Sequence, residues 1–277
     1  MPVVGSNGIG VWYDECGDPE DPVLLLISGL GSHGTGFAPA FCSAFVDRGL
    51  RVIRFDNRDM GFSTHDEAWQ YTLEDMAADA FGLLDALGIE RAHLWGTSMG
   101  GMIAQTMAIA APERVATLTS VMSSTGEPGV GGPDPAILPQ LLELSRPVAS
   151  AEEAVELGMA MARLIGSGPD LFDEAEHRRR QTEQSLRHLD PGGTQRQLMA
   201  VVSSPSRTEA LRRLTVPTLV IHGTHDRLAD PSGGRHLAEL VPGARLLELE
   251  GMGHDLPSAL WPLMVEATID HIAAHAA

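Results

Sequence analysis

The sequence contains no lysine, and all 19 residues of the lysine and arginine class are arginine. This absence excludes enzymes that hold a substrate or pyridoxal phosphate as a lysine Schiff base, and nucleotide-binding proteins that need a P-loop lysine. The 37 acidic residues outnumber the basic ones and give a formal net charge of -18. A surface of this sign repels phosphate backbones and anionic lipid, so we expect neither nucleic acid nor a membrane as a partner.

Cysteine is scarce, and long apolar runs are missing. The two cysteines, Cys16 and Cys42, form no C-x-x-C motif, so neither a zinc ribbon nor a disulfide framework is predicted. No segment approaches the roughly 18 consecutive apolar residues of a membrane-spanning helix, and the N-terminus does not resemble a secretory leader. We therefore expect a soluble, cytoplasmic protein in a reducing compartment.

The composition is that of a globular protein, 43% hydrophobic and 20% charged over 277 residues. Short apolar runs alternate with helical patterns, which is typical of β-α-β units in a mostly parallel sheet. The clearest helix runs from Leu73 to Leu87, behind Thr72 and Asp75 at capping-box spacing. The predicted parallel strands are residues 23–28, 51–56, 92–95, 115–122, 218–222 and 244–249, with an antiparallel edge strand around residues 11–14.

The middle of the chain follows a different pattern. Between residues 126 and 209 the strand signal disappears, and helical segments broken by proline and glycine take its place. We predict an α/β fold in which a core of residues 1–125 and 210–277 carries a helical cap of residues 126–209. An insertion near the carboxyl ends of the strands can cover the crevice where such sheets bind ligands.

A G-x-S-x-G motif directly follows the third predicted parallel strand, as Gly96-Thr97-Ser98-Met99-Gly100. An apolar helical run comes next, which gives the strand-turn-helix context of a nucleophile elbow. The glycines are needed because a sharp turn brings backbone against both positions. We predict Ser98 as the nucleophile. The pattern alone also occurs in ordinary glycine-rich turns, so the assignment depends on partner residues elsewhere.

A serine hydroxyl needs a histidine base and a carboxylate that orients it. Asp226 and His254 follow the last two predicted strands in the order that accompanies a nucleophile elbow, so we predict them as acid and base. Asp255 is the weaker candidate, because a residue rarely turns its carboxylate toward the ring of its chain neighbour. Glu127 and Asp134, after the fourth predicted strand, are reserve candidates for the acid.

The turn after the first predicted parallel strand, Gly29-Leu30-Gly31, lies where an oxyanion-binding amide is expected. We assign the oxyanion hole to the backbone N–H groups of Leu30 and Met99. Because the role belongs to the backbone, the side chains at these positions carry little information.

Taken together, these motifs resemble the α/β-hydrolase family over nearly the whole chain. Two further blocks, residues 56–63 and residues 251–257, resemble aclacinomycin-methylesterase-like esterases and the related cofactor-free haloperoxidases, which are also esterases. Ser98 separates the chain from epoxide hydrolases and haloalkane dehalogenases of this fold, whose nucleophile is aspartate. One departure is that Ser28-Gly29 stands where His-Gly is common, which leaves the hydrogen bonding of the loop open.

The resemblance implies a serine hydrolase that cleaves a carboxylic ester through an acyl-enzyme, with no metal and no organic cofactor. From the charge and the apolar cap we expect a small to medium, neutral or cationic ester as the substrate. Perhydrolase or haloperoxidase chemistry and the hydrolysis of thioesters, lactones or C–C bonds use the same triad and stay open. The sequence gives no indication of the oligomeric state.

Two readings from other classes compete. Gly29, Gly31 and Gly34 match the G-x-G-x-x-G of dinucleotide-binding proteins, and Asp56 follows at about the 20-residue spacing of that fingerprint. Pro39 argues against it, because the helix that should begin on the pyrophosphate is interrupted. A binding protein without catalysis is the other alternative, and loss of a triad residue would be its usual mark.

Several polar and sulfur-containing residues have structural explanations. We expect Arg58 to hold Asp56 or the nearby turn, and His222 and His225 to pack in the acid loop without binding a metal. The remaining expectations are a solvated helix face at residues 178–180 and cap packing by Met159, Met161, Leu164 and Ile165.

Overall fold

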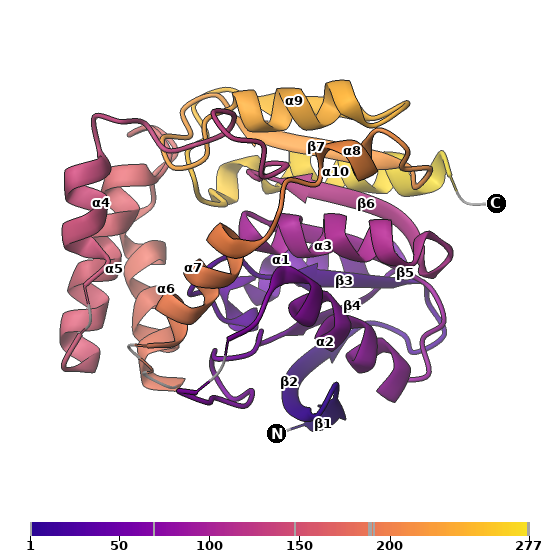
Figure 1. The fold of residues 1–277 in the computed structure, drawn as a ribbon, viewed down its shortest axis with the longest axis horizontal. Coiled ribbons are helices and arrows are strands. Elements are labelled where there is room, and N and C mark those ends of the chain that lie inside the picture. Colours follow the sequence, from indigo (N-terminus) through magenta and orange to yellow (C-terminus); the bar gives the residue numbers. More distant parts are fainter. Residues whose placement is uncertain (1, 69, 147, 188–189, 191, 276–277) are drawn as a thin grey trace.

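The structure is a computed structural model that describes residues 2–68, 70–146, 148–187, 190 and 192–275. Its centre is an eight-stranded sheet in the order β1-β2-β4-β3-β5-β6-β7-β8 (Figure 1). Strands from β4 to β8 in this order pair in parallel, whereas β1 and β2 are antiparallel. The strands are β1 (Val3–Ser6), β2 (Ile9–Cys16), β3 (Val23–Ile27), β4 (Arg51–Phe55), β5 (Ala92–Thr97), β6 (Val115–Val121), β7 (Thr218–Gly223) and β8 (Arg245–Leu249).

Every predicted parallel strand is present with nearly the predicted ends, and the expected edge strand is β2. The first strand, β1, was not predicted. It forms a hairpin with β2 through Asn7 and Gly8, which have positive φ angles of 47° and 82°. Asn-Gly is a strong hairpin signal, so the sequence did contain the information for this strand.

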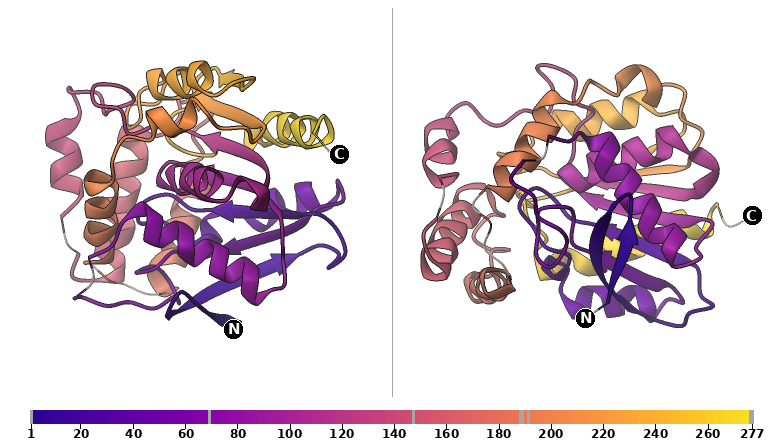
Figure 2. Two further views of the ribbon diagram at one scale, coloured as in Figure 1. Left: turned by 45° about the vertical axis from the view of Figure 1, so that its right-hand side comes forward. Right: turned by 60° about the horizontal axis from the view of Figure 1, so that its bottom comes forward.

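Helices cover both faces of the sheet (Figures 1 and 2). One face shares a hydrophobic core with α2 (Leu73–Ala86), α3 (Met99–Ala110) and α9 (Ser232–Leu240). The other face packs on α1 (Pro39–Val46) and α10 (Trp261–Ala273). The shorter elements are α8 (Thr208–Leu211) and the 3-10 turns Gly34–Gly36, Pro112–Arg114 and Ser258–Leu260.

Strand β3 shows why the sequences of the parallel strands are continuous apolar runs. Leu25 and Ile27 belong to the core beneath α2 and α3, whereas Leu24 and Leu26 belong to the core beneath α1 and α10. All four side chains are fully buried. Since helices cover both faces, alternation between apolar and polar residues is lost, as expected for a parallel sheet.

Helix α2 begins at the predicted capping box. The Thr72 hydroxyl accepts a hydrogen bond from the Asp75 amide at 3.4 Å, and the Asp75 carboxylate accepts one from the Thr72 amide at 2.8 Å. Both amides belong to the first turn, which lacks acceptors within the helix. The reciprocal pair therefore fixes where the helix begins.

Four helices, α4 (Leu138–Leu144), α5 (Ala151–Ile165), α6 (Glu174–Arg187) and α7 (Gly193–Ser203), stand together beside one end of the sheet (Figures 1 and 2). We call them the α4–α7 layer. Its residues contact loops that follow strands: Gln197 Oε1 accepts from the Gly31 amide at 2.9 Å, and the Ile165 carbonyl accepts from the His254 amide at 2.7 Å. The layer thus lies at the carboxyl end of the sheet.

The predicted fold class is confirmed: the sheet is mostly parallel, flanked by helices on both faces. Among the residues that the structure describes, no helix has both the length and the apolar character needed to cross a membrane.

Candidate active site

The turn from β5 into α3 raises Ser98 above the sheet. Its backbone has φ 53° and ψ -120°, an unfavourable region for a residue with a Cβ. Two glycines make the turn sterically possible: a Cβ on Gly96 would overlap the carbonyl of Gly100, and one on Gly100 would overlap the carbonyl of Ile27. The G-x-S-x-G motif therefore has the local geometry of a nucleophile elbow.

The three predicted catalytic residues lie within hydrogen-bonding distance of one another. Ser98 Oγ is 3.0 Å from His254 Nε2, and His254 Nδ1 is 2.7 Å from Asp226 Oδ2. Because an ionised carboxylate can only accept, His254 Nδ1 carries the proton of the neutral ring. Nε2 then presents its lone pair to the serine hydroxyl, as a general base requires.

Asp226 lies in the loop after β7 and is buried. Its Oδ1 accepts hydrogen bonds from the amides of Leu228 and Ala229 at 2.9 and 2.8 Å, and His222 Nε2 lies 3.4 Å from its Oδ2. Burial alone would raise the pKa of Asp226. The charge of His254 and these hydrogen bonds outweigh burial and hold the pKa well below its usual range.

The other carboxylates considered for this position lie elsewhere. Asp255 turns away from the ring of His254 and accepts hydrogen bonds from Ser167 and His177. Glu127 accepts from Ser206 and Thr208, and Asp134 forms an ion pair with Arg227. Of these candidates, Asp226 is the one bonded to His254.

The loop after β3 passes directly beside the serine. A Cβ on Gly29 would lie 3.2 Å from Ser98 Cβ, so this loop can approach closely only with glycine there. Leu30 follows at once, and Met99 is the first residue of α3, whose N–H has no acceptor within the helix. Leu30 and Met99 thus directly follow Gly29 and Ser98, the two residues that are in contact here.

The substitution of Ser28 for the common histidine has a local explanation. Ser28 Oγ donates to the carbonyl of His33 at 3.0 Å, and the Ser28 carbonyl accepts from the Asn57 side chain at 3.1 Å. Gln197 from α7 supports the same loop by bridging the Gly31 amide and the Arg58 carbonyl, each at 2.9 Å. Sequence reasoning did not find Gln197, because no local motif marks a contact made across so much of the chain.

The dinucleotide-binding reading disagrees with the geometry. Gly34 begins a 3-10 turn, and α1 begins only at Pro39, so the helix that follows this strand does not begin on the glycines as a dinucleotide-binding helix does. Asp56 is fully buried, and its carboxylate accepts from the amides of Gly34 and Phe62 at 2.8 and 2.9 Å, with Arg187 beside it. It is therefore not available to a ribose.

Two expectations about arginines need correction. Arg58 was expected to hold Asp56 or the turn, but it forms a two-point ion pair with Asp79 of α2 at 2.6 and 2.7 Å. Among residues 178–180, Arg178 and Arg179 form exposed ion pairs as expected, whereas Arg180 is partly buried beside His177. Burial lowers the pKa of Arg180.

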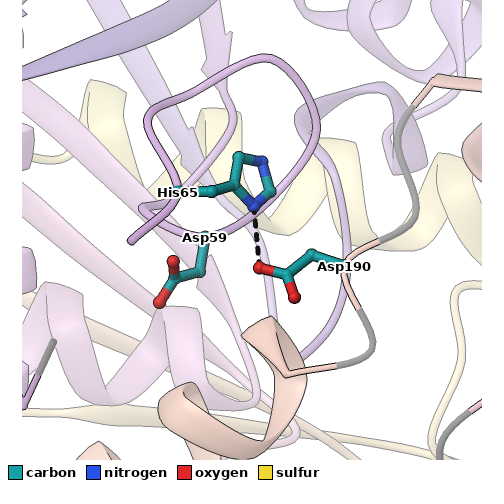
Figure 3. A group of neighbouring side chains, drawn as sticks. All are labelled: Asp59, His65 and Asp190. Carbon is teal, nitrogen blue, oxygen red and sulfur yellow. Dashed lines mark hydrogen bonds and ion pairs between the residues drawn. The ribbon is translucent and has the colours of Figure 1, made fainter. Parts of the chain in front are cut away.

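One cluster of side chains has the donor types of a metal site (Figure 3). Atoms of Asp59, His65 and Asp190 lie within 4.8 Å of one another, and His65 Nδ1 is 3.0 Å from Asp190 Oδ2. Arg196 of α7 already pairs with both carboxylates, through bonds of 2.8 and 2.9 Å to Asp59. One guanidinium is therefore already shared by the two carboxylates, and the cluster ties α7 to the loop after β4.

The comparisons with known proteins agree with this geometry. A model of the alpha/beta hydrolase fold family matches residues 22–257. The chain belongs to this family, as the motifs predicted.

Individual relatives within this family indicate which kinds of enzyme the chain is similar to. Rhodomycin D methylesterase of Streptomyces peucetius is 32% identical, with 98% of each chain aligned. A Mycobacterium tuberculosis protein named as a candidate non-heme bromoperoxidase is 29% identical over 89% of this chain and 91% of that protein. The crystal structure of the enol-lactonase of Burkholderia xenovorans superposes with a TM-score of 0.81 at 26% identity, covering 98% of this chain and all of that one. The predicted relationship to methylesterases and haloperoxidases is confirmed, and these relatives support hydrolysis as the reaction class.

Proposed function

We propose that the protein hydrolyses a carboxylic ester through an acyl-enzyme formed on Ser98, with His254 as general base and acid and Asp226 as the residue that orients it. The observation that carries the proposal is the pair of contacts of 3.0 and 2.7 Å that joins the three side chains at a strained turn. The positive φ of Ser98 supports it, since strain of this kind is concentrated at functional sites.

Acylation begins when the ester carbonyl lies above Ser98. His254 Nε2 takes the hydroxyl proton while Ser98 Oγ forms a bond to the carbonyl carbon. Asp226 stays ionised, because its pKa is held low, and stabilises the imidazolium. The tetrahedral intermediate then collapses, the C–O bond to the alcohol breaks, and His254 returns the proton to the leaving oxygen.

The negative oxygen of the intermediate is bound by the Leu30 and Met99 amides. A donor of this kind contributes roughly 3 kcal/mol to the transition state in other enzymes. In the second half of the reaction His254 takes a proton from water while the water oxygen bonds to the acyl carbon. The bond to Ser98 Oγ then breaks, His254 returns the proton to Oγ, and the acid is released. Apart from the ester and water, each step described here uses side chains and amides of this chain.

The substrate is a neutral or cationic ester, with a methyl ester as the leading candidate. The methylesterase named among the relatives supports the methyl ester, and the net charge of -18 disfavours a strongly anionic substrate. We further propose residues 126–209 as a cap over the site, because the α4–α7 layer lies at the carboxyl end of the sheet where α/β proteins bind ligands. A cytoplasmic location stays a prediction.

A lactone is the second candidate substrate. The enol-lactonase among the structural neighbours matches 98% of this chain and all of its own, at 26% sequence identity and a TM-score of 0.81. Since a lactone is an internal ester, the same attack by Ser98 opens the ring without releasing a separate alcohol.

Hydrolysis of a series of p-nitrophenyl esters, from acetate to octanoate, tests the proposal. The purified protein is expected to release p-nitrophenol, and Ser98→Ala is expected to lose at least about 10³-fold in kcat. Ser145→Ala is the matched control, because this hydroxyl follows the last residue of α4 and donates only locally, to the Leu141 carbonyl. Turnover by Ser98→Ala within a few-fold of the parent would contradict the proposal.

A further inference from the structure

The loop that carries His254 is held by the α4–α7 layer as well as by the sheet. We call residues 250–257, after β8, the histidine loop, and residues 166–173, between α5 and α6, the α5–α6 loop. The His254 amide donates to the Ile165 carbonyl at 2.7 Å, and the Gly168 amide donates to the Gly251 carbonyl at 2.9 Å. The backbone of the base is thus hydrogen-bonded to a segment far away in the sequence.

Ser167 extends this attachment on both sides of His254. Its hydroxyl accepts from the Gly253 amide at 3.0 Å and donates to Asp255 Oδ1, and its own amide also donates to Asp255 Oδ1, at 3.0 Å. Ser167 and Asp255 are both buried. One serine therefore fixes the chain neighbours of the base on either side.

Asp255 is completed by His177 of α6. His177 Nε2 lies 3.0 Å from Asp255 Oδ2, and His177 Nδ1 lies 2.9 Å from Arg180 Nη2. A guanidinium has only donors, so Nδ1 must accept and Nε2 carries the proton that is donated to Asp255. The His177 ring also stacks on Phe172, with centroids 4.4 Å apart. The donors and acceptors of Ser167, Asp255 and His177 are therefore matched to one another.

The two loops approach so closely that side chains are excluded. A Cβ on Gly253 would overlap the backbone of Gly166 and lie 2.6 Å from the Ser167 amide. Contacts between backbones leave little freedom for sliding. The position of the base therefore follows the position of the α5–α6 loop.

From these contacts we infer that Ser167 and Asp255 are positioning residues for His254, so that the α4–α7 layer sets the alignment of the catalytic base. The inference rests on the proposed function. In this view the Asp255 carboxylate, one residue from the base, is not part of the triad. Its task is to bind Ser167 and His177 and so to hold the histidine loop against the α5–α6 loop and α6. A misplacement of the base of about 1 Å can cost up to about 100-fold in rate, so loss of these bonds acts on kcat.

Two variants test the inference. Ser167→Ala removes the hydroxyl that joins Gly253 to Asp255. Asp255→Asn keeps the shape of the side chain but sets an amide donor against the His177 donor or against Ser167. We expect each variant to lower kcat by about 10- to 100-fold with KM nearly unchanged. The second-order rate of labelling by a fluorophosphonate should fall in parallel, because labelling depends on the activated serine and not on ester binding.

The controls separate positioning from folding and from the proposed function. Ser145→Ala, which removes a hydroxyl of the α4–α7 layer away from the histidine loop, should keep the parent kcat and labelling rate. If Ser167→Ala and Asp255→Asn lower only the melting temperature, with kcat and labelling unchanged in folded protein, the residues are structural and the inference is wrong. If Asp255→Asn does not fold, Ser167→Ala alone decides. Absence of labelling in the parent protein would instead contradict the proposed function.

Discussion

Asp226 has two tasks that its surroundings separate cleanly. One oxygen accepts from the Leu228 and Ala229 amides, and the other faces His254. The first set fixes the carboxylate in the loop after β7, and the second fixes the tautomer of the base. An amide in this place can satisfy only one of the two sets.

Asp226→Asn is therefore predicted to be folded and nearly inactive. The Asn oxygen keeps the bonds to the Leu228 and Ala229 amides, which turns its NH₂ group toward His254 Nδ1. This geometry favours the tautomer with the proton on Nε2, which cannot accept from Ser98. We expect kcat to fall by about 10⁴-fold, as in other Ser-His-Asp enzymes, with little change in melting temperature. Asp134→Asn, at an exposed ion pair, is the control and should stay active.

The pH dependence of the parent enzyme follows from the same pair. Because the pKa of Asp226 is held below its usual range, this carboxylate stays ionised throughout the range in which histidine titrates. Activity should rise from about pH 5 to about pH 8, because histidine side chains in general change charge in this range and only the neutral ring can act as base. A profile of kcat/KM that is flat over this range would contradict the role of His254.

The sequence predicted the three residues of the candidate triad, but it did not predict the residues that hold the surrounding loops in place. Ser98, Asp226 and His254 follow strands within local motifs, and the structure brings them together as expected. Ser167 and Gln197 were not found, because their contacts join segments that no local pattern connects. Arg58 was assigned the wrong partner for the same reason, since Asp79 lies on a different element.

The packing of helices against the sheet depends on a few glycine positions at which two backbone segments are in direct contact. The turn between β5 and α3 is the tightest of these, since Gly100 packs directly on the carbonyl of Ile27 at the end of β3. Its lack of a side chain lets α3 lie against the sheet and fixes the height of Ser98 above it. Stability and activity are therefore linked at this turn.

Gly100→Ala is predicted to damage both properties. The added methyl overlaps backbone atoms that cannot rotate away, so β3 and α3 must move apart. We expect the free energy of unfolding to fall by about 2–3 kcal/mol, together with most of the activity. Urea denaturation and ester hydrolysis measure the two effects. Gly132→Ala, at a position with open space around it, should change stability by less than about 0.5 kcal/mol. Equal stabilities for the two variants would show that the turn tolerates a side chain.

Strands and helices were predicted where the pattern is repeated over several residues. The buried strands and the capped helix α2 agree with the sequence, because hydrophobic runs and capping boxes are local signals. The hairpin strand β1 was missed, although Asn7-Gly8 marks its turn. The segment Val3–Ser6 is only four residues long and contains two apolar side chains, so its periodicity is too weak to indicate a strand.

Over the whole molecule, buried histidines make stability depend on pH. His93 in β5 is buried, with Nδ1 2.9 Å from Thr117 Oγ1. Burial, with smaller contributions from the charges of Arg91 and His271, lowers the pKa of His93 to about 4. In the unfolded chain a histidine binds its proton near pH 6.5. Between these values the unfolded state holds more protons, so stability falls as the pH falls.

His93→Asn is predicted to weaken this dependence. In the parent, acidification from about pH 7.5 to 5 should cost about 2 kcal/mol of unfolding free energy through His93 alone. The variant keeps a polar group near Thr117 but has no proton to gain. Urea denaturation at both pH values should therefore show a smaller acid loss for the variant. An equal loss in both proteins would mean that His93 gains no proton on unfolding in this pH range, which would contradict the prediction.

The overall architecture was predictable because the serine, aspartate and histidine motifs follow successive strands in the chain order that is typical of the α/β-hydrolase fold. The α/β-hydrolase class is confirmed by the family match and by the parallel sheet. The arrangement of the α4–α7 layer was not predictable, because polar contacts such as that between Gln197 and Gly31 place it, and no periodic pattern encodes them. The division into core and cap stays a proposal.

Covalent labelling with a fluorophosphonate probe, followed by intact-mass analysis, tests most directly whether Ser98 is the activated nucleophile. We expect one adduct per chain on the parent protein and on Ser145→Ala, and none on Ser98→Ala. An adduct that persists in Ser98→Ala, or a folded parent protein that takes no label, would contradict the assignment of Ser98 as the activated nucleophile.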